Sequence, residues 1–590
     1  MLLLLLTIGP ASASLLPHML APLRQPALDA DPACLFPQGF NGERNRTMGA
    51  EGERRRGVGV RKTRRQRISA FMSTGVYSHD IMFNALMADL TRDKSVEMAA
   101  FQIRVFEFNV TSAWPRLHRS NLNYTTFARS SSLGTSVIEW SQRTMWEASL
   151  PFDVPSGMRN PESLLGLQRI FEAHQSQCHH ALREGRLPRE ALRQETDLIL
   201  LDYILNECLI DLAAQVPGRP GLVLVNFLMP PGYREQLGLP TFPAYMPEIL
   251  TGITAPLPFL SRLRNTVEFA LTRLMAEAVY TLFQHQRSLA PYPLASPEAE
   301  QQDYRRFINS ALLYLNPMEQ LLDVPRPLSS RVKLVGASSS PHLQQSSTQP
   351  FPFSQRLGIG SISPAGIVLA SFGSTVSCDR IPKHLLTAML KVYGELNQTV
   401  VWSGFFDRLR LSQVEIPPNV HLLGWIPIKD ILRDERVVLL VSHGGFNTLT
   451  ESGFRVPILF VPLHSDHKYW AARMTEKRMG EFIEPWQNGE AIFRTKLRLL
   501  LDNYSQYQSQ LRSFKERQSS LAQLNSLAPA PSLKAFWSAW ALRRRHGLLN
   551  QPSFLGLGPA HPQHAYLAYF GLDWLLLLSA LLLPSLHCLS

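Results

Sequence analysis

The sequence is poor in cysteine and in charged side chains for its length. Its 590 residues include only five cysteines, which are widely spaced and form no CxxC pair, and this argues against a zinc ribbon or a disulfide-dense scaffold. Charged residues make up 18% of the chain and hydrophobic residues 45%, which excludes a disordered tail or a collagen-like fibre. At roughly 150 residues per domain, we expect several folded domains.

The net charge of +12 first suggests a nucleic-acid binder, but the positive excess is local. Residues 43–67 hold ten Lys and Arg against three Asp and Glu, and the rest of the chain holds 49 against 44. This basic stretch precedes the first expected strand and has no aromatic partners. We therefore interpret it as a disordered leader and expect no nucleic-acid partner.

Both ends of the chain indicate a membrane protein of the secretory pathway. Residues 1–14 are an apolar run followed by small residues, which is typical of a signal peptide, and the basic leader would then occupy 15–66. The apolar segment 564–590 predicts a single transmembrane helix, with a removable lipid-anchor signal as the alternative. Five N-x-[ST] sequons permit a lumenal location.

Strands alternate with helices in two long stretches, which is typical of the α/β class with doubly wound parallel sheets. The first stretch, 67–336, contains the strand, loop and helix RISAFMST, GVYSHD and IMFNALMADLTRD, and a mostly helical part at 251–325. Residues 337–362 are rich in Ser, Gln, Pro and Gly and predict a linker. The second stretch, 363–530, runs from GIVLASFGS past ILFVPL, and a helical tail is expected at 531–563.

The most specific stretch of the sequence is 437–467, VVLLVSHGGFNTLTESGFRVPILFVPLHSDH. A buried strand leads into SHGG at 442–445, and a helix is expected to start near Asn447. Adjacent glycines let backbone amides approach a ligand closely, and a helix amino terminus favours an anion such as pyrophosphate. His443 can add a side-chain donor, and Glu451 can accept from ribose hydroxyls. An isolated HGG would be weak evidence, because a helix-capping turn also explains it.

This combination resembles the UDP-glycosyltransferase family, which includes the animal glucuronosyltransferases and their invertebrate relatives. The family's signature runs from Trp-x-Pro-Gln through [ST]-H-G-G-x-N-[ST] and a helix Glu to Pro-Leu-x-x-Asp-Gln. This chain has WIPI at 425–428, SHGGFNT at 442–448, Glu451, and PLHSDH at 462–467. The resemblance covers roughly residues 67–585 and is highly specific.

The resemblance implies a GT-B arrangement of two Rossmann-like domains, in which the second domain binds a UDP-sugar. Trp425 would stack on uracil and Glu451 would hold the ribose. Asp466 and His467 would meet the sugar hydroxyls. The diphosphate would be surrounded by Ser374, His443, Gly444, Gly445, Asn447 and Thr448.

Two positions depart from the family's pattern. Ile428 stands where the family usually has Gln after Trp-x-Pro, and His467 stands where it usually has Gln after the sugar-binding Asp. A neutral imidazole donates once and accepts once, whereas an amide can donate twice and accept twice. The donor sugar therefore stays open among UDP-glucuronate, UDP-glucose and UDP-galactose.

The resemblance also implies a catalytic pair in the first domain. The family's catalytic His follows the first strand, often as Tyr-Ser-His, and His79 matches it in Tyr77-Ser78-His79. Its orienting Asp ends a strand reading D-x-x-x-x-D, and Asp202 matches it after Asp197. An imidazole can take a proton from an alcohol or phenol, and a carboxylate on its other nitrogen orients it. Considered alone, His79 would be a helix-start His and Asp202 a strand-end cap.

These residues predict an inverting glycosyltransferase that moves a hexose or glucuronic acid from a UDP-sugar to a hydroxyl of a small lipophilic acceptor. UDP-sugar is the donor substrate, and neither a cofactor nor a metal is expected, because the Cys178-His179-His180 run has no second ligand pair. We expect a single-pass protein of the endoplasmic reticulum membrane, in contact with membrane lipid and with lumenal catalytic domains. The oligomeric state stays open, and a homo-oligomer is one option.

Two alternatives stay open at this point. One is a membrane-anchored UDP-sugar binder without transfer activity, which the departures at Ile428 and His467 motivate. The other is a UDP-sugar epimerase on the same architecture. The terminal apolar helix and the His–Asp pair argue against the epimerase.

Overall fold

The structure is a computed structural model of the chain. The predicted signal peptide, helical tail and transmembrane segment lie outside the residues that it describes, as does nearly all of the predicted leader. Across the described ranges, no helix has both the length and the apolar character needed to cross a membrane. The described residues are 65–72, 77–92, 94, 96–104, 120–128, 176, 180, 195–203, 206–218, 220–226, 242–249, 251–254, 257–289, 304–319, 321–325, 328–329, 331–335, 350–373, 376, 378–407, 411–463, 466–483 and 489–525.

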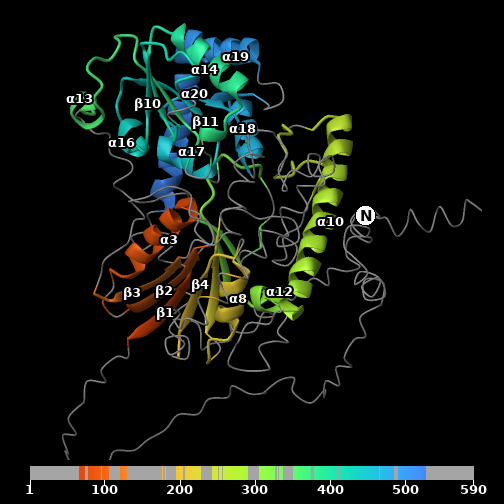
Figure 1. The fold of residues 1–590 in the computed structure, drawn as a ribbon. Coiled ribbons are helices and arrows are strands. Elements are labelled where there is room, and N and C mark those ends of the chain that lie inside the picture. The colour runs from red at the N-terminus through yellow and green to blue at the C-terminus, as the bar shows by residue number, and fades with distance from the viewer. Residues whose placement is uncertain are drawn as a thin grey trace, which may run out of the picture. The chain divides into compact units, whose positions relative to one another are not determined.

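The first sheet has seven parallel strands in the order β3-β2-β1-β4-β5-β6-β7 (Figure 1). The chain runs outward from β1 to β3 and then returns to the other side of β1, so the order reverses between β1 and β4. Ligands of open parallel sheets bind at such a reversal, beyond the carboxyl ends of the strands. The strands are β1 (Gln66–Phe71), β2 (Val96–Arg104), β3 (Leu122–Ala128), β4 (Leu198–Leu201), β5 (Gly221–Val225), β6 (Leu313–Asn316) and β7 (Val332–Leu334).

The helices of the first half differ from the sequence prediction at one important boundary. The pattern predicts a loop at GVYSHD, but α3 already begins at Tyr77, so His79 lies in its first turn. The strand β6 also interrupts the part predicted to be mostly helical, because four buried residues are too few to show a period. The helices are α3 (Tyr77–Leu90), α8 (Glu207–Ala214), α10 (Phe259–Leu289) and α12 (Tyr304–Asn309).

The second sheet has six parallel strands in the order β10-β9-β8-β11-β12-β13. Its order reverses between β8 and β11, so the residues that follow these two strands meet at one sheet edge. The prediction of two parallel sheets is therefore confirmed, and both fit Rossmann-like domains. The strands are β8 (Ile367–Ser371), β9 (Thr399–Ser403), β10 (Val420–Leu423), β11 (Val437–Ser442), β12 (Ile458–Phe460) and β13 (Gly480–Phe482).

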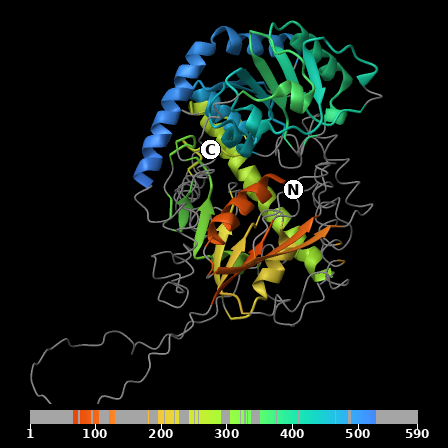
Figure 2. The ribbon, with the colours of Figure 1, turned by 90° about the vertical axis from the view of Figure 1, so that its left-hand side faces the viewer.

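The helices of the second half include one that lies inside the predicted linker. Phe351 lies just before α13 and Phe353 is its first residue. Both side chains are buried and belong to the main hydrophobic core, so this part of the predicted linker is packed. Figure 2 shows α20 as a single long blue helix. The helices are α13 (Phe353–Leu357), α14 (Lys383–Gly394), α16 (Ile428–Ile431), α17 (Phe446–Ser452), α18 (His467–Glu476), α19 (Glu490–Asp502) and α20 (Tyr504–Asn525), with a 3-10 turn at Cys378–Arg380.

Strands at the centre of both sheets are buried on both faces, as parallel sheets require. All four residues of β4 are completely buried, and so are Leu439, Leu440 and Val441 of β11. Each such side chain stabilises the fold by about 1.5–3 kcal/mol relative to an exposed one. The carboxyl ends of these strands are thereby fixed, and the polar residues that follow them start from rigid positions.

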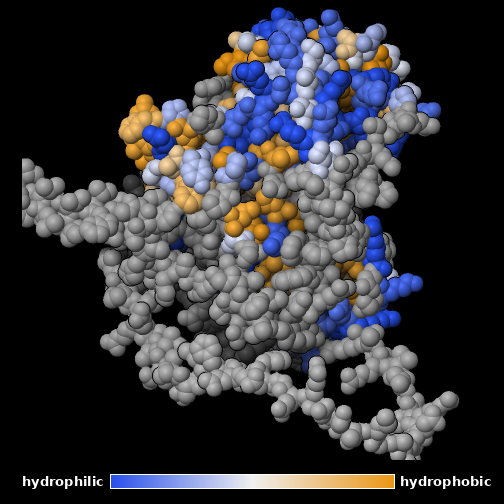
Figure 3. Space-filling view, turned by 180° about the vertical axis from the view of Figure 1, so that it is seen from behind, coloured by the Kyte–Doolittle hydropathy of each residue, from blue (hydrophilic) through white to orange (hydrophobic). Residues whose placement is uncertain are grey.

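The start of α10 presents an apolar surface rather than a core face. Phe259 and Leu260 are 68% and 74% exposed, and Leu263 and Val267 continue the same surface. This part of the helix forms the orange patch at the upper left of Figure 3. These apolar side chains therefore do not contribute to the core of the described part of the chain.

Candidate active site

His79 and Asp202 form a direct hydrogen bond although 123 residues separate them. The Nδ1 atom of His79 lies 2.6 Å from Oδ2 of Asp202. His79 is buried in the first turn of α3, and Asp202 is completely buried directly after β4. An ionised carboxylate can only accept, so Nδ1 carries the hydrogen and Nε2 is the nitrogen that can take up a proton. The ring is thus held in the tautomer that a general base needs.

The other oxygen of the Asp202 carboxylate accepts a hydrogen bond from a second strand end. Asn226 directly follows β5, and its Nδ2 atom donates to Oδ1 of Asp202 over 2.5 Å. Tyr314 of β6 donates its hydroxyl hydrogen to the backbone carbonyl of Asn226 over 2.7 Å. Burial and the nearby Asp202 charge raise the pKa of Tyr314 well above its ordinary value, so it stays a donor. The carboxylate is therefore fixed from two sides.

Asn206 ties the ends of β1 and β4 together beneath this pair. Its Nδ2 atom donates to the carbonyls of Asp202 and Met72, over 2.6 and 2.9 Å. Asn206 is the N-cap residue of α8, but its Oδ1 atom accepts no capping bond from the helix, since the amide group is oriented by the two bonds that its Nδ2 atom donates. The sequence pattern did not predict Asn206, Asn226 or Tyr314. The available signal was an Asn directly after, or shortly after, a buried strand.

Asp197, the first Asp of the D-x-x-x-x-D pattern, lies at the opposite end of β4. Its Oδ2 atom accepts from the backbone N–H of Arg67 over 2.8 Å, and its own N–H donates to the Arg67 carbonyl. The two aspartates are therefore separated by the length of the strand. Asp197 joins the amino ends of β1 and β4, while Asp202 faces His79.

In the second sheet, the imidazole of His443 lies buried against two glycines. A Cβ atom on Gly373, after β8, would lie 2.7 Å from Cε1 of His443, and a Cβ atom on Gly445 would lie 2.7 Å from its Nε2. Ser442 places its hydroxyl oxygen 3.1 Å from Nδ1. The glycines are expected from the sequence to expose backbone amides, and the structure adds that they make room for the His443 ring. Gly373 was not among the predicted site residues.

His467 packs its ring edge against His443. The ring centroids are 4.4 Å apart and the planes cross at 83°. The N–H of Leu463 lies 3.4 Å from Nδ1 of His467, so a neutral His467 carries its hydrogen on Nε2. The neighbouring Asp466 accepts a hydrogen bond from the indole N–H of Trp470, one turn along α18. The structure thus brings His443, predicted to face the diphosphate, and His467, predicted to face the sugar, into direct ring contact.

The helix α17 carries three further predicted residues. Gly445 is its N-cap and no side chain caps it, while the N–H groups of Thr448 and Leu449 already donate to the Gly445 carbonyl. Thr448 is buried and Asn447 is half-buried. Gly444 adopts φ +89°, and a Cβ atom there would lie 2.8 Å from the Phe460 ring, which excludes any other residue.

Glu451, in the last turn of α17, has a raised pKa and is therefore a weaker acid than an ordinary glutamate. Burial raises the pKa of this half-buried carboxyl to about 7, although the nearby Lys429 of α16 opposes the shift. Near neutral pH the group therefore exists in both forms, and it can donate a hydrogen bond as well as accept one. That property suits a partner with hydroxyl groups.

Trp425 and Ile428, which are three residues apart, differ in their exposure to solvent. Trp425 is 45% exposed, so a large part of its side chain is open to solvent. Ile428, at the start of α16, packs against the main apolar core, so the family's usual Gln is replaced by a core contact.

Ser374 lies outside the described residues, as do Cys178 and His179. Within the described ranges, no three His, Cys, Asp or Glu side chains are grouped so that they could hold a metal ion.

Comparison with known proteins identifies the family. Residues 94–517 match the model of the family described as UDP-glucoronosyl and UDP-glucosyl transferase. The chain belongs to this family of glycosyltransferases. The resemblance inferred from the signature motif is thereby confirmed.

The curated relatives are distant. The mouse 2-hydroxyacylsphingosine 1-beta-galactosyltransferase is 24% identical over 422 residues, which is 70% of this chain and 71% of the relative. The cattle UDP-glucuronosyltransferase 3A1 is 24% identical over 378 residues, 63% of this chain and 66% of the relative. The human 2-hydroxyacylsphingosine 1-beta-galactosyltransferase is 26% identical, but the chain spans only 52% of its length.

Solved glycosyltransferase structures align over most of the chain at still lower identity. The calicheamicin glycosyltransferase CalG4 gives a TM-score of 0.47 at 17% identity, with 82% of this chain and all of that chain covered. A UDP-glucosyltransferase from Polygonum tinctorium, solved with 3,4-dichloroaniline, gives 0.47 at 14% identity, with 81% and 98% covered.

Proposed function

We propose that the protein is an inverting UDP-glycosyltransferase that moves a hexose or glucuronic acid to a hydroxyl group of a small lipophilic acceptor. The observation that carries this proposal is the buried hydrogen bond between His79 and Asp202 at the order reversal of the first sheet. Family membership supplies the reaction class, and the pair supplies the base that the reaction needs.

In the proposed step, Nε2 of His79 takes the hydroxyl proton of the acceptor while its oxygen attacks the anomeric carbon. The bond between the new oxygen and that carbon forms as the bond to the β-phosphate oxygen breaks, and UDP leaves with the electron pair. Asp202 stabilises the imidazolium that forms, and Asn226 keeps the carboxylate oriented. A single displacement inverts the anomeric centre, so an α-linked donor yields a β-glycoside.

The proposed donor site is the edge of the second sheet where β8 and β11 end. Trp425 stacks on uracil, and Glu451, with a pKa of about 7, bonds to the ribose hydroxyls. The departing diphosphate receives hydrogen bonds from His443 and from backbone N–H groups around Gly444 and Gly445, which is electrostatic stabilisation of a developing charge. We expect no metal cofactor for this step.

In this proposal, Asp466 and His467 form hydrogen bonds with the hydroxyl groups of the donor sugar. With Nδ1 of His467 turned to the Leu463 N–H, only the Nε2 hydrogen is offered to the sugar. UDP-glucuronate, UDP-glucose and UDP-galactose all remain within the proposal, and the relatives named above include both galactosyl and glucuronosyl transferases. A lumenal, single-pass location in the endoplasmic reticulum membrane, with lipid contact, also belongs to the proposal and rests on the two ends of the sequence.

A second candidate is a UDP-sugar binder without transfer activity. Ile428 favours it, because a side chain packed into the core cannot replace the hydrogen bonds of the family's Gln. His467 favours it as well, because it offers one donor in place of an amide group. This candidate predicts UDP binding without acceptor-dependent UDP release.

The test is UDP release by the full chain, with a panel of small phenols and the three UDP-sugars offered in turn. We expect release with one donor, loss of that release in His79→Ala, and unchanged UDP affinity in the same variant. His384→Ala is the matched control, because this exposed histidine of α14 lies in another part of the fold. Retained turnover in His79→Ala would exclude the proposed base, and UDP binding without any release would favour the inactive binder.

A further inference from the structure

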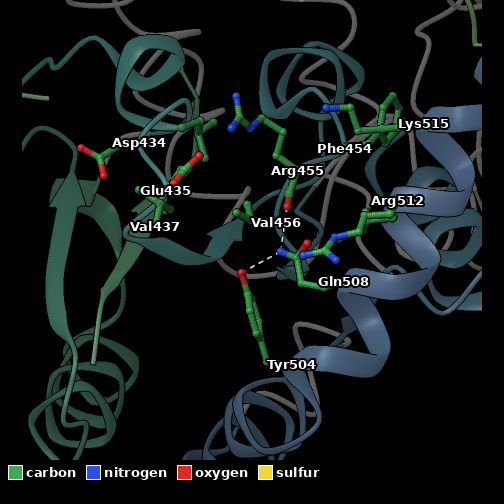
Figure 4. A pocket seen from close by; sticks show the side chains of 12 residues that line it. Asp434, Glu435, Val437, Phe454, Arg455, Val456, Tyr504, Gln508, Arg512 and Lys515 are labelled. Carbon is green, nitrogen blue, oxygen red and sulfur yellow. Dashed lines mark hydrogen bonds between the residues drawn. The ribbon is translucent and has the colours of Figure 1, made fainter. Parts of the chain in front are cut away.

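A cavity lies at the opposite end of the second sheet from the predicted donor residues. Its volume is about 410 Å³, and it is lined by one face of α20, the segment before β11 and the segment between α17 and β12 (Figure 4). Val437, which lines it, begins β11, whereas Ser442 at the donor edge ends that strand. At roughly 3.3 Å per residue, the two ends are about 17 Å apart. The cavity is therefore separate from the proposed active site.

The floor of this cavity is apolar, its exposed lining is mainly polar, and its polar groups are held in place. Leu432, Val456 and Leu511 line it and are buried. Gln508 of α20 uses both amide hydrogens, one to the hydroxyl of Tyr504 over 2.7 Å and one to a backbone carbonyl over 2.8 Å. Since the Tyr504 oxygen accepts from Gln508, the phenol keeps its own hydrogen to donate. Burial raises the pKa of Tyr504, so that hydrogen is retained at neutral pH.

Three cationic side chains surround the same space. Arg455 comes from the segment after α17, and Arg512 and Lys515 come from α20. Figure 4 shows Arg512 reaching from the helix toward the centre of the cavity, below Arg455. Lys515 is half-buried, and both burial and the nearby charge of Arg455 lower its pKa. Lys515 and Arg455 therefore repel each other, and an anion bound beside them would relieve that repulsion.

The two acidic residues of the cavity do not balance this charge. Asp434 is already neutralised by Arg436, whose Nε and Nη2 atoms donate to its carboxylate over 3.0 and 2.7 Å. The same carboxylate accepts from the N–H of Phe351 over 2.6 Å. Glu435 is exposed and supplies one negative charge, against the two positive charges of Arg512 and Lys515. The cavity keeps a positive surplus.

The backbone at the cavity is held in an uncommon conformation. Phe454, which lines it, has φ +52°, in the left-handed region that bulky side chains rarely occupy. Its ring packs on Phe514 of α20 with the centroids 4.8 Å apart, and the turn carries the next residue, Arg455, to the cavity. Such strain persists where surrounding contacts enforce it, and it is concentrated at binding sites.

We propose that this cavity binds a phosphate-type anion attached to an apolar body, such as the phosphate monoester of an aromatic or alkyl group. The phosphate oxygens would accept from Arg512, Lys515 and the Tyr504 hydroxyl, and the apolar body would lie on Leu432, Val456 and Leu511. The volume lies in the range of small-molecule sites. A soluble phosphate ester and a phospholipid headgroup share this chemistry.

The test is calorimetric titration of phenyl phosphate into the full chain, with saturating UDP present to occupy the donor site. We expect Arg512→Gln and Lys515→Gln each to weaken binding about threefold to fivefold, and the double variant about tenfold or more. Arg517→Gln, an exposed arginine of the same helix that does not line this cavity, should stay within about twofold. Equal affinity in the double variant, or no saturable binding, would overturn the proposal.

Three further ligands define the chemistry. Inorganic phosphate should bind about tenfold more weakly because it lacks the apolar body, and equal affinity would overturn that part of the proposal. The uncharged triester dimethyl phenyl phosphate should not bind, and binding as tight as that of phenyl phosphate would overturn the anionic part. Binding to vesicles of phosphatidylcholine with phosphatidic acid distinguishes the two sources of the phosphate group. Binding by the wild-type chain that is lost in the double variant would identify a lipid ligand, and no binding by the wild-type chain would identify a soluble ligand. None of these readouts depends on transfer activity, so they remain decisive if the proposed function fails.

Discussion

The two predicted groups of site residues are built by different means. In the first half, His79, Asp202 and Asn226 are joined by side-chain hydrogen bonds between the ends of separate strands. In the second half, the His443 ring is positioned by shape, between Gly373 and Gly445 and against His467. A hydrogen-bonded site fails when one polar atom changes, whereas a packed site fails when volume is added. Each kind of site therefore has its own most damaging substitution.

The largest effect is expected from Asp202→Asn, which keeps the shape of the first site and changes one atom. An amide nitrogen would donate to Nδ1 of His79 and force the hydrogen onto Nε2, the nitrogen that must take the proton. We expect kcat to fall by about 10³–10⁴-fold, as for other His–Asp pairs. Single-turnover kinetics measure the loss, and UDP affinity, measured separately, should be unchanged. A loss below about tenfold would show that the carboxylate does not orient the base.

Glu451 should make the stability of the second half depend on pH. Its pKa is raised from 4.5 to about 7, so between these pH values the folded state binds more protons than the unfolded state. Stability therefore falls as pH rises from about 4.5 to 7, by up to about 2–3 kcal/mol for this shift. Urea unfolding of the wild-type chain and of Glu451→Gln across this range measures the difference. The variant should lose that part of the slope, and parallel curves would contradict the raised pKa.

Gly373→Ala tests whether the second site depends on packing. The new Cβ atom would lie 2.7 Å from the His443 ring, and φ +76° is unfavourable for alanine. We expect UDP to bind about tenfold more weakly, which corresponds to about 1.4 kcal/mol, because His443 must move. Gly360→Ala is the control, since a Cβ atom there would meet nothing within 4 Å. Equal UDP affinity in both variants would show that the position of the ring does not matter.

The same contrast explains what the sequence could predict. The residues of the second site lie largely in one contiguous stretch, so a single motif names them and the family. Asp202 and His79 could be paired only through the resemblance, and Asn226 and Tyr314 were missed because their contacts depend on the order of β4, β5 and β6. Short buried strands such as β6 have no period to detect. Gly373 was missed because its role is to leave space for a side chain 70 residues away along the chain.

The smallest effect is expected from His467→Gln, which restores the family's usual residue inside the packed site. The amide oxygen can accept from the Leu463 N–H as Nδ1 does now, and the NH₂ group then offers the sugar two hydrogens where the imidazole offers one. We expect the ratio of kcat/KM between UDP-glucuronate, UDP-glucose and UDP-galactose to change by about threefold to tenfold, since one hydrogen bond is gained. Competition assays with paired donors measure that ratio, with His384→Gln as a surface control. An unchanged ratio would mean that position 467 supports His443 by packing and does not select the sugar.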